Sequence, residues 1–214
     1  MSAAPASDLR IAAVHVARAQ VLGGTVHVVG DDSAALSGVR AAGQGDAVEI
    51  LRATARSGDA AIIVGAFADR DRLLARLPAW GVAGIWVGDA QRPADGMATV
   101  CVAGDAEVVV PGILALADDL REDPAALQPA IVECTDEVCI TCSDEGRLGE
   151  VLAAPPVLFA PARVRTADGQ EDVDVTILGH VRPGDLVLIH AGMAIATVPL
   201  PPEVPVPIAA EVMS

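Results

Sequence analysis

The sequence predicts a mixed α/β protein with two domains. Residues 1–125 are expected to form a three-layer domain around a parallel sheet, because short, almost continuously apolar runs alternate there with helical patterns. Residues 134–214 are expected to form a small all-β barrel with a proline-rich tail, because short strand-like runs separated by turn residues replace the helical patterns. Pro124 and Pro129 mark the linker between the two domains.

The elements of the first domain follow from periodicity and from end signals. Residues 8–22 predict an amphipathic helix that Ser7 or Asp8 caps and that Gly23 and Gly24 end. The expected strands are 25–29, 59–64, 82–87 and 98–103, and the further expected helices begin near 34 and cover 47–56, 69–77 and 108–121. Ligands of parallel sheets bind beyond the carboxyl ends of the strands, so the loops that follow these strands are candidate ligand sites.

Two of these loops read Gly30-Asp31-Asp32-Ser33 and Gly65-Ala66-Phe67-Ala68. With the layout of residues 8–122, they resemble the sugar-isomerase (SIS) domain of the phosphoheptose-isomerase type, whose loop hydroxyls and N–H groups bind phosphate at helix N-termini. The resemblance implies a phosphosugar-binding isomerase or regulator with a site at Ser33, Asp32 and Gly65. The aspartates would repel phosphate and the second loop lacks hydroxyls, so we expect a degenerate site. Residues 31–33 could instead bind a cation or cap the following helix, of which we favour capping. The resemblance also implies a homodimer that pairs through 108–120.

The second domain is expected to consist of short strands and turns. Residues 162–165 and 171–178 predict two strands joined by a hairpin turn at 167–170. The prolines within 153–161 predict an extended or looped edge segment. The turn Pro183-Gly184-Asp185 precedes a short apolar run, 186–189, which predicts a buried strand that delivers His190 to its end.

Two thiols and this histidine form the main candidate site. Cys139-Ile140-Thr141-Cys142 places two cysteines near the start of the second domain, and thiolates with an imidazole suit a soft metal. A redox pair is one alternative, and a zinc site that adds Cys134 and His190 is another.

The segment 139–198 resembles the HypC/HupF family of nickel–iron hydrogenase maturation chaperones. Its signature reads Gly184-Asp185-Leu-Val-Leu-Ile-His190-Ala-Gly-Met-Ala-Ile195 here. The resemblance implies an OB-like barrel without enzymatic activity. It would handle the Fe(CN)2CO precursor of the hydrogenase iron with a HypD-like scaffold and deliver it to the hydrogenase large subunit. Cys139 would supply the thiolate, with Cys142 as a second sulfur donor and His190 close by.

Two departures from that family stand out. The family's cysteine follows the initiator methionine, whereas Cys139 lies deep inside this chain, so a peptide N–H replaces a free amine. The family ends in an acidic helix, whereas the tail from Pro199 to Pro207 holds too many prolines to be helical.

Composition limits the remaining function classes. The net charge of −15, with 14 arginines as the only basic residues, argues against nucleic-acid binding and favours neutral or basic protein partners. No apolar run is long enough for a membrane span and no secretory signal is visible, so we expect a cytoplasmic protein with reduced thiols. Cys101 is expected in a core strand, His15 and His27 in packing or surface roles, and His180 in a solvated loop.

Overall fold

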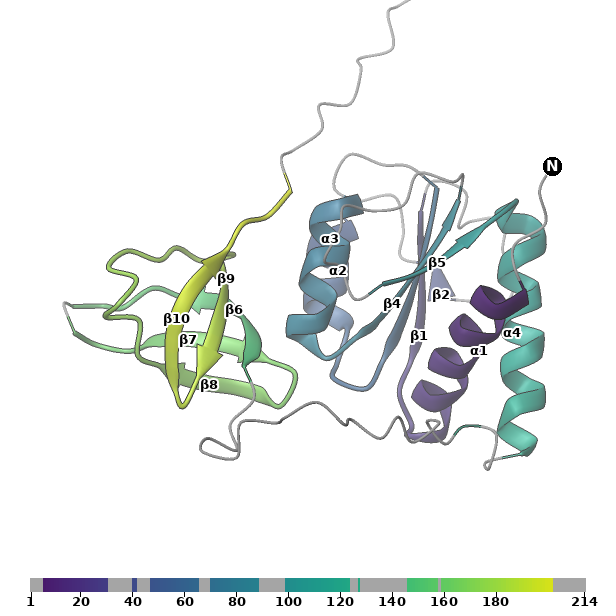
Figure 1. Ribbon diagram of the computed structural model, residues 1–214, viewed down its shortest axis with the longest axis horizontal. Coiled ribbons are helices and arrows are strands. Elements are labelled where there is room, and N and C mark those ends of the chain that lie inside the picture. The colour runs from purple at the N-terminus through teal and green to yellow at the C-terminus, as the bar shows by residue number, and fades with distance from the viewer. Residues whose placement is uncertain are drawn as a thin grey trace, which may run out of the picture.

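The computed structural model describes residues 6–30, 40–41, 47–65, 70–88, 99–123, 127, 146–157 and 159–201. It contains two separate sheets, a parallel one in the first half of the chain and an antiparallel one in the second half (Figure 1). A mixed α/β fold with a parallel sheet and a separate all-β part is therefore confirmed.

The parallel sheet has the strand order β2-β1-β3-β4-β5. Its elements are α1 (Ala6–Val21), β1 (Val26–Gly30), β2 (Arg40–Ala41), α2 (Ala47–Thr54), β3 (Ala60–Val64), α3 (Arg70–Arg76), the 3₁₀ helix η2 (Leu77–Trp80), β4 (Ala83–Gly88), β5 (Thr99–Ala103) and α4 (Ala106–Glu122). β2 is a two-residue edge strand, so the four longer strands form most of the sheet. This order is that of a doubly wound sheet, in which the chain reverses its direction of winding between β1 and β3.

Helices cover both faces of the parallel sheet. The central strand β3, Ala-Ala-Ile-Ile-Val, is buried along its whole length, as a strand covered on both sides must be. Ile62 packs with α1 and α4 on one face, and Ile63 packs with α2, α3 and η2 on the other. Figure 1 shows α2 and α3 lying between the parallel sheet and the antiparallel sheet.

The expected elements of this half recur with shifted ends. Helix α1 begins at Ala6, ahead of the expected caps Ser7 and Asp8. Helix α4 begins at Ala106, because the side chain of Asp105 accepts a hydrogen bond from the N–H of Glu107 at 3.0 Å and caps the helix there. The start of the helix expected near 34 lies outside the described residues, but β2 shows that it does not extend through 40.

The antiparallel sheet has the strand order β10-β9-β6-β7-β8. Its strands are β6 (Arg147–Ala153), β7 (Ala162–Thr166), β8 (Gly169–Val173), β9 (Leu186–His190) and β10 (Met193–Val198). The central strand β6 was not expected. The expected strand 171–178 was too long: β8 ends at Val173, because the Asp174 carboxylate accepts hydrogen bonds from Thr176 N (2.8 Å) and Oγ1 (2.5 Å) and turns the chain.

A second core fills one face of this sheet, and the edge strands meet at one point. Val151, Val164, Val187 and Ile189 are buried together there. Asp174, just after β8, donates its N–H to Gly192 O (3.1 Å) and accepts from Ala194 N (2.8 Å) at the start of β10. The described residues show no longer ladder between β8 and β10, so a closed, OB-like barrel stays a prediction.

The first core extends past the expected end of the first domain. Leu127, placed in the linker by the sequence, is buried against the α1 and α4 layer, and its carbonyl oxygen accepts hydrogen bonds from Arg18 Nε (3.0 Å) and Nη2 (2.7 Å). The remaining residues between 124 and 145 lie outside the described part, and with them the expected domain boundary. Among the described helices, none is long and apolar enough to cross a membrane.

Candidate functional site

His190 is the last residue of β9, as the sequence predicts, and is half-buried. Residues of a strand alternate between its two faces, so Leu186, Leu188 and His190 share the face opposite to the core residues Val187 and Ile189. Arg147 of β6 pairs with Ile189, so β6 begins beside the end of β9 that carries His190. Cys139 and Cys142 precede this start of β6 in the sequence and lie outside the described residues.

Most of the signature around His190 has a structural role. Gly184 has φ of +91°, and its N–H donates to Val151 O at 2.8 Å. Asp185 closes the same turn, because its Oδ2 accepts from the N–H of Arg182 at 2.8 Å. Ala194 is buried in the core. The turn after His190 is a two-residue hairpin of the type in which both residues have positive φ. The His190 ring makes no side-chain hydrogen bond with the described residues.

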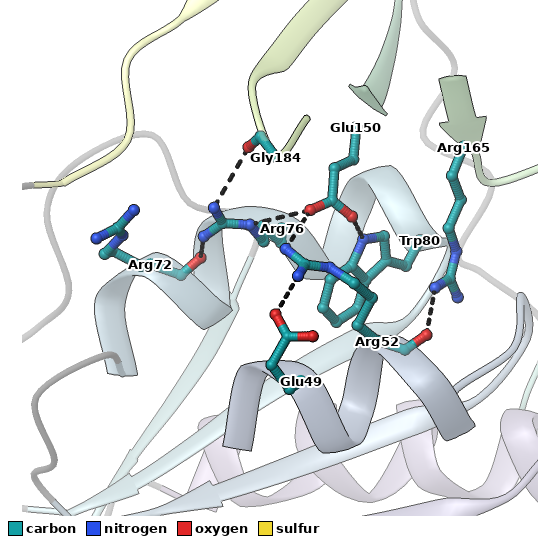
Figure 2. Close-up of polar contacts among 8 residues, drawn as sticks. All are labelled: Glu49, Arg52, Arg72, Arg76, Trp80, Glu150, Arg165 and Gly184. Carbon is teal, nitrogen blue, oxygen red and sulfur yellow. Dashed lines mark hydrogen bonds and ion pairs between the residues drawn. The ribbon is translucent and has the colours of Figure 1, made fainter. Parts of the chain in front are cut away.

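A polar cluster, which was not expected from the sequence, lies between the antiparallel sheet and the helices that cover the parallel sheet (Figure 2). Its centre is Glu150 in β6, whose side chain is completely buried. Oε2 accepts a hydrogen bond from Trp80 Nε1 at 2.6 Å, and Oε1 lies 2.7 Å from Arg52 Nη2 and 3.3 Å from Arg76 Nε. A buried carboxylate needs such compensation, because an unpaired charge in the interior is very costly.

Two further arginine contacts cross the same interface. Arg76, at the end of α3, donates from Nη2 to the carbonyl oxygen of Gly184 at 3.3 Å. In the opposite direction, Arg165 of β7 donates to the carbonyl oxygens of Arg52 (3.0 Å) and Ala55 (2.6 Å) at the C-terminal end of α2. Its guanidinium also lies 5.0 Å from the ring centroid of Trp80. A cation at a helix C-terminus pairs with the orphan carbonyls and with the helix dipole.

The charges of the cluster perturb one another. Burial lowers the pKa of Arg76, and the neighbouring charges of Arg52 and Arg72 lower it further, while Glu150 opposes them. For Arg52, burial acts in the same direction, but Glu150 and Glu49 outweigh it and raise its pKa. The single carboxylate of Glu150 therefore offsets the repulsion between two arginines that the interface brings together.

Apolar contacts surround the cluster. Leu186 is buried in the core of α2, α3 and η2, and Leu148, Val198 and Leu200 pack against that core from the second half of the chain. The register places Arg165, Glu150, Leu186 and Val198 in one row across β7, β6, β9 and β10. This row lies on the face of the antiparallel sheet that packs against α2, α3 and η2.

A sequence signal for Glu150 did exist. It stands alone as a charge in the run Leu148-Gly-Glu150-Val-Leu-Ala-Ala154. A carboxylate inside an apolar strand-length run is a candidate for a buried, paired charge. Its arginine partners are far away in the sequence, so no local pattern connects them to it.

The predicted phosphosugar site is described at one residue only. Gly65 follows β3 at the carboxyl edge of the parallel sheet, donates its N–H to Val87 O (3.0 Å) and accepts from Trp86 Nε1 (3.4 Å). Arg70 stacks over the Trp86 ring, with 4.9 Å to the centroid. Ser33 and Asp32 lie outside the described residues, so whether the three residues meet stays untested.

The remaining candidates have packing or surface roles. Cys101 is half-buried against the core of α2, α3 and η2, and His180 is exposed. His15 is half-buried in α1, where burial lowers its pKa and the charge of Arg18 adds to that effect. His27 is buried and donates from Nε2 to Asp59 Oδ2 at 2.9 Å.

The described residues contain no group of three or more histidines, cysteines, aspartates or glutamates placed to hold a metal ion. Any metal site that His190 joins therefore needs ligands from the segments not described, where Cys134, Cys139 and Cys142 lie. No family model and no curated protein matches this chain.

Proposed function

We propose that the protein is a non-enzymatic assembly chaperone for nickel–iron hydrogenase, in which Cys139, Cys142 and His190 handle the Fe(CN)2CO precursor. The proposal is supported by the roles of the residues in the signature segment, 184–195. Gly184 and Asp185 form a turn, and Val187 and Ala194 are buried in the core. His190 belongs to neither the turn nor the core, and its ring makes no side-chain hydrogen bond with the described residues. A role as a metal ligand therefore accounts for it most simply.

The length of the intervening chain allows Cys142 to lie near this histidine. Cys142 comes four residues before Gly146, the residue that precedes β6. A chain of that length spans at most about 14 Å, and the start of β6 lies beside the end of β9. Thiolate and imidazole donors suit low-valent iron that carries carbon monoxide and cyanide, and binding of the metal would deprotonate the thiols.

The hairpin also offers a contact for a protein partner. Ile195 is the extra residue of a β-bulge in β10, because Ala194 pairs with Ile189 and Ala196 pairs with Leu188. The residue is 44% exposed, although its side chain is large and apolar. An exposed isoleucine near His190 supports docking of a scaffold such as a HypD-like protein, with the hydrogenase large subunit as the recipient of the iron.

Iron content and scaffold pull-down of the intact protein test this proposal. We expect Cys139→Ala to abolish iron loading or scaffold binding, Cys142→Ala to weaken it, and His190→Ala to reduce it. His180→Ala is the matched control, since His180 is exposed in the same half of the chain. Wild-type iron content and pull-down in all three variants would end the chaperone proposal. One equivalent of zinc in the purified protein, lost together in the Cys139 and Cys142 variants, would favour a zinc-binding adaptor instead.

A further inference from the structure

We propose that Glu150 is an ionic latch that holds the two sheets in one fixed orientation. The latch is defined as Glu150 with its three donors Arg52, Arg76 and Trp80 (Figure 2). This proposal is independent of the chaperone function, because it concerns how the two halves of the chain are joined.

The positions of the three donors restrict the carboxylate of Glu150 to one place. Arg52 belongs to α2, Arg76 to α3 and Trp80 to η2, so one carboxylate is held from three elements of the same layer. Apolar contacts such as those of Leu186 tolerate sliding, since burial of apolar surface has no preferred direction. A completely buried carboxylate does not tolerate sliding, because even a small shift between the layers leaves its charge without a partner.

Two arginines, one from each side of the interface, make further contacts that fix how the two layers pack. Arg76 uses one side of its guanidinium for Glu150 and another nitrogen for the carbonyl oxygen of Gly184, so it holds β6 and the turn before β9 together. Arg165 reaches the other way, to the end of α2, and covers the Trp80 ring. Each layer thus inserts at least one charged side chain into the other.

The latch fixes the relative positions of two tether points. Helix α4 ends at Glu122 on the far side of the parallel sheet, and β6 begins at Arg147 in the antiparallel sheet (Figure 1). The intervening chain contains Cys134, Cys139 and Cys142. With the latch closed, both ends of that cysteine-bearing segment are held at a constant separation.

Arginine labelling of the intact protein tests the latch directly. Phenylglyoxal modifies exposed guanidinium groups, and Arg76 is only 5% exposed. In the wild-type protein we expect Arg76 to react much more slowly than Arg121, an exposed arginine of α4. In Glu150→Ala, labelling of Arg76 should increase several-fold relative to Arg121. Small-angle scattering should show a larger radius of gyration, and circular dichroism should show unchanged helix content.

Two further variants keep the test decisive. Glu150→Gln preserves the size of the side chain and removes its charge, so it decides the matter if Glu150→Ala does not fold, and it should also raise Arg76 labelling. Asp172→Asn removes an exposed carboxylate from the same sheet and should leave Arg76 protected. Wild-type protection of Arg76 and a wild-type radius of gyration in a folded Glu150→Gln protein would overturn the proposal.

Discussion

Asp59 gathers three N–H donors at the amino end of the parallel sheet. Its carboxylate accepts from the backbone N–H groups of Thr25 (2.7 Å) and Arg56 (2.8 Å) and from His27 Nε2 (2.9 Å). Burial alone would raise the pKa of Asp59, but these hydrogen bonds outweigh it and lower the pKa. Ligands of open parallel sheets generally bind at the opposite edge, so we assign His27 and Asp59 a structural role.

Asp59 should therefore make stability depend on pH. Because the folded-state pKa is lowered, its contribution is fully present above the unfolded value of about 3.8 and is lost as the pH falls through the folded value. We expect urea unfolding midpoints of the wild-type protein to fall more steeply below about pH 4 than those of Asp59→Asn. At neutral pH, Asp59→Asn should be destabilised by about 1–3 kcal/mol. Parallel pH curves for the two proteins would contradict this assignment.

Ala191 carries a conformational cost in the hairpin turn after His190. Its φ is +50°, in the left-handed region where a Cβ atom costs about 1–2 kcal/mol, and Gly192 follows with φ of +78°. Asn-Gly is the preferred pair for such a turn. Ala191→Asn should stabilise the protein by roughly 0.5–1 kcal/mol, measured by urea denaturation. A loss of stability would show that Ala191 makes a contact that outweighs the strain.

At the scale of elements, β6 is the strand on which the antiparallel half depends. It pairs with both β7 and β9, and its two faces meet different cores. Gly149 and Val151 face the core of the sheet, and Leu148 and Glu150 face the α/β layer. A Cβ atom at Gly149 would collide with Val164 and would lie 2.7 Å from Ile189 Cδ1.

Replacement of two glycines by alanine should therefore have opposite effects. Gly149→Ala should destabilise the protein by about 1–3 kcal/mol, because the added methyl overpacks a filled core. Gly112→Ala should stabilise it by about 0.5–1 kcal/mol, since it lies inside α4 and the added Cβ would have no atom within 4 Å apart from the nearby backbone of its own helix and its chain neighbours. Thermal unfolding of both variants checks this. An equal loss of stability in the two would show that backbone effects, and not packing, determine the outcome.

The two sheets differ in how far the sequence could predict them. β1, β3 and β4 are buried between helices, so they are short apolar runs that the sequence displays openly. β6 is a weaker signal, because Gly149 and Glu150 interrupt its apolar run, and the reason for both residues lies in partners far away in the sequence. The position of His190 was predictable from a turn and a strand, whereas the cluster around Glu150 depends on contacts between residues far apart in the chain.

For the whole molecule, the interface between the halves is part of the core rather than an accessory to it. Trp80, Leu77 and Leu51 are fully buried in a cluster that Leu186 completes from the other sheet. A fragment that ends at residue 127 would expose part of this cluster together with Arg76 and Trp80.

We therefore expect the fragment 1–127 to be less stable than the intact chain and to bind a dye for exposed apolar surface, such as ANS. Limited proteolysis of the intact protein should cut first between 123 and 133 or in the proline-rich tail, without separating the two halves under native conditions. A fragment as stable as the whole chain, with no increase in dye binding, would contradict the shared core.

The partners of Glu150 are synthesised before Glu150 itself, which matters for how the cluster forms during folding. Arg52, Arg76 and Trp80 all leave the ribosome before Glu150 does, and chain growth runs at about 5–20 residues per second. For several seconds a nascent α/β layer thus presents two arginines and a tryptophan that are made to receive a carboxylate. In a chain with 29 acidic residues, many wrong carboxylates are available during that interval. The apolar contacts beside Glu150 supply the selection, because only a carboxylate that packs next to Leu148 and Leu186 is sealed from water.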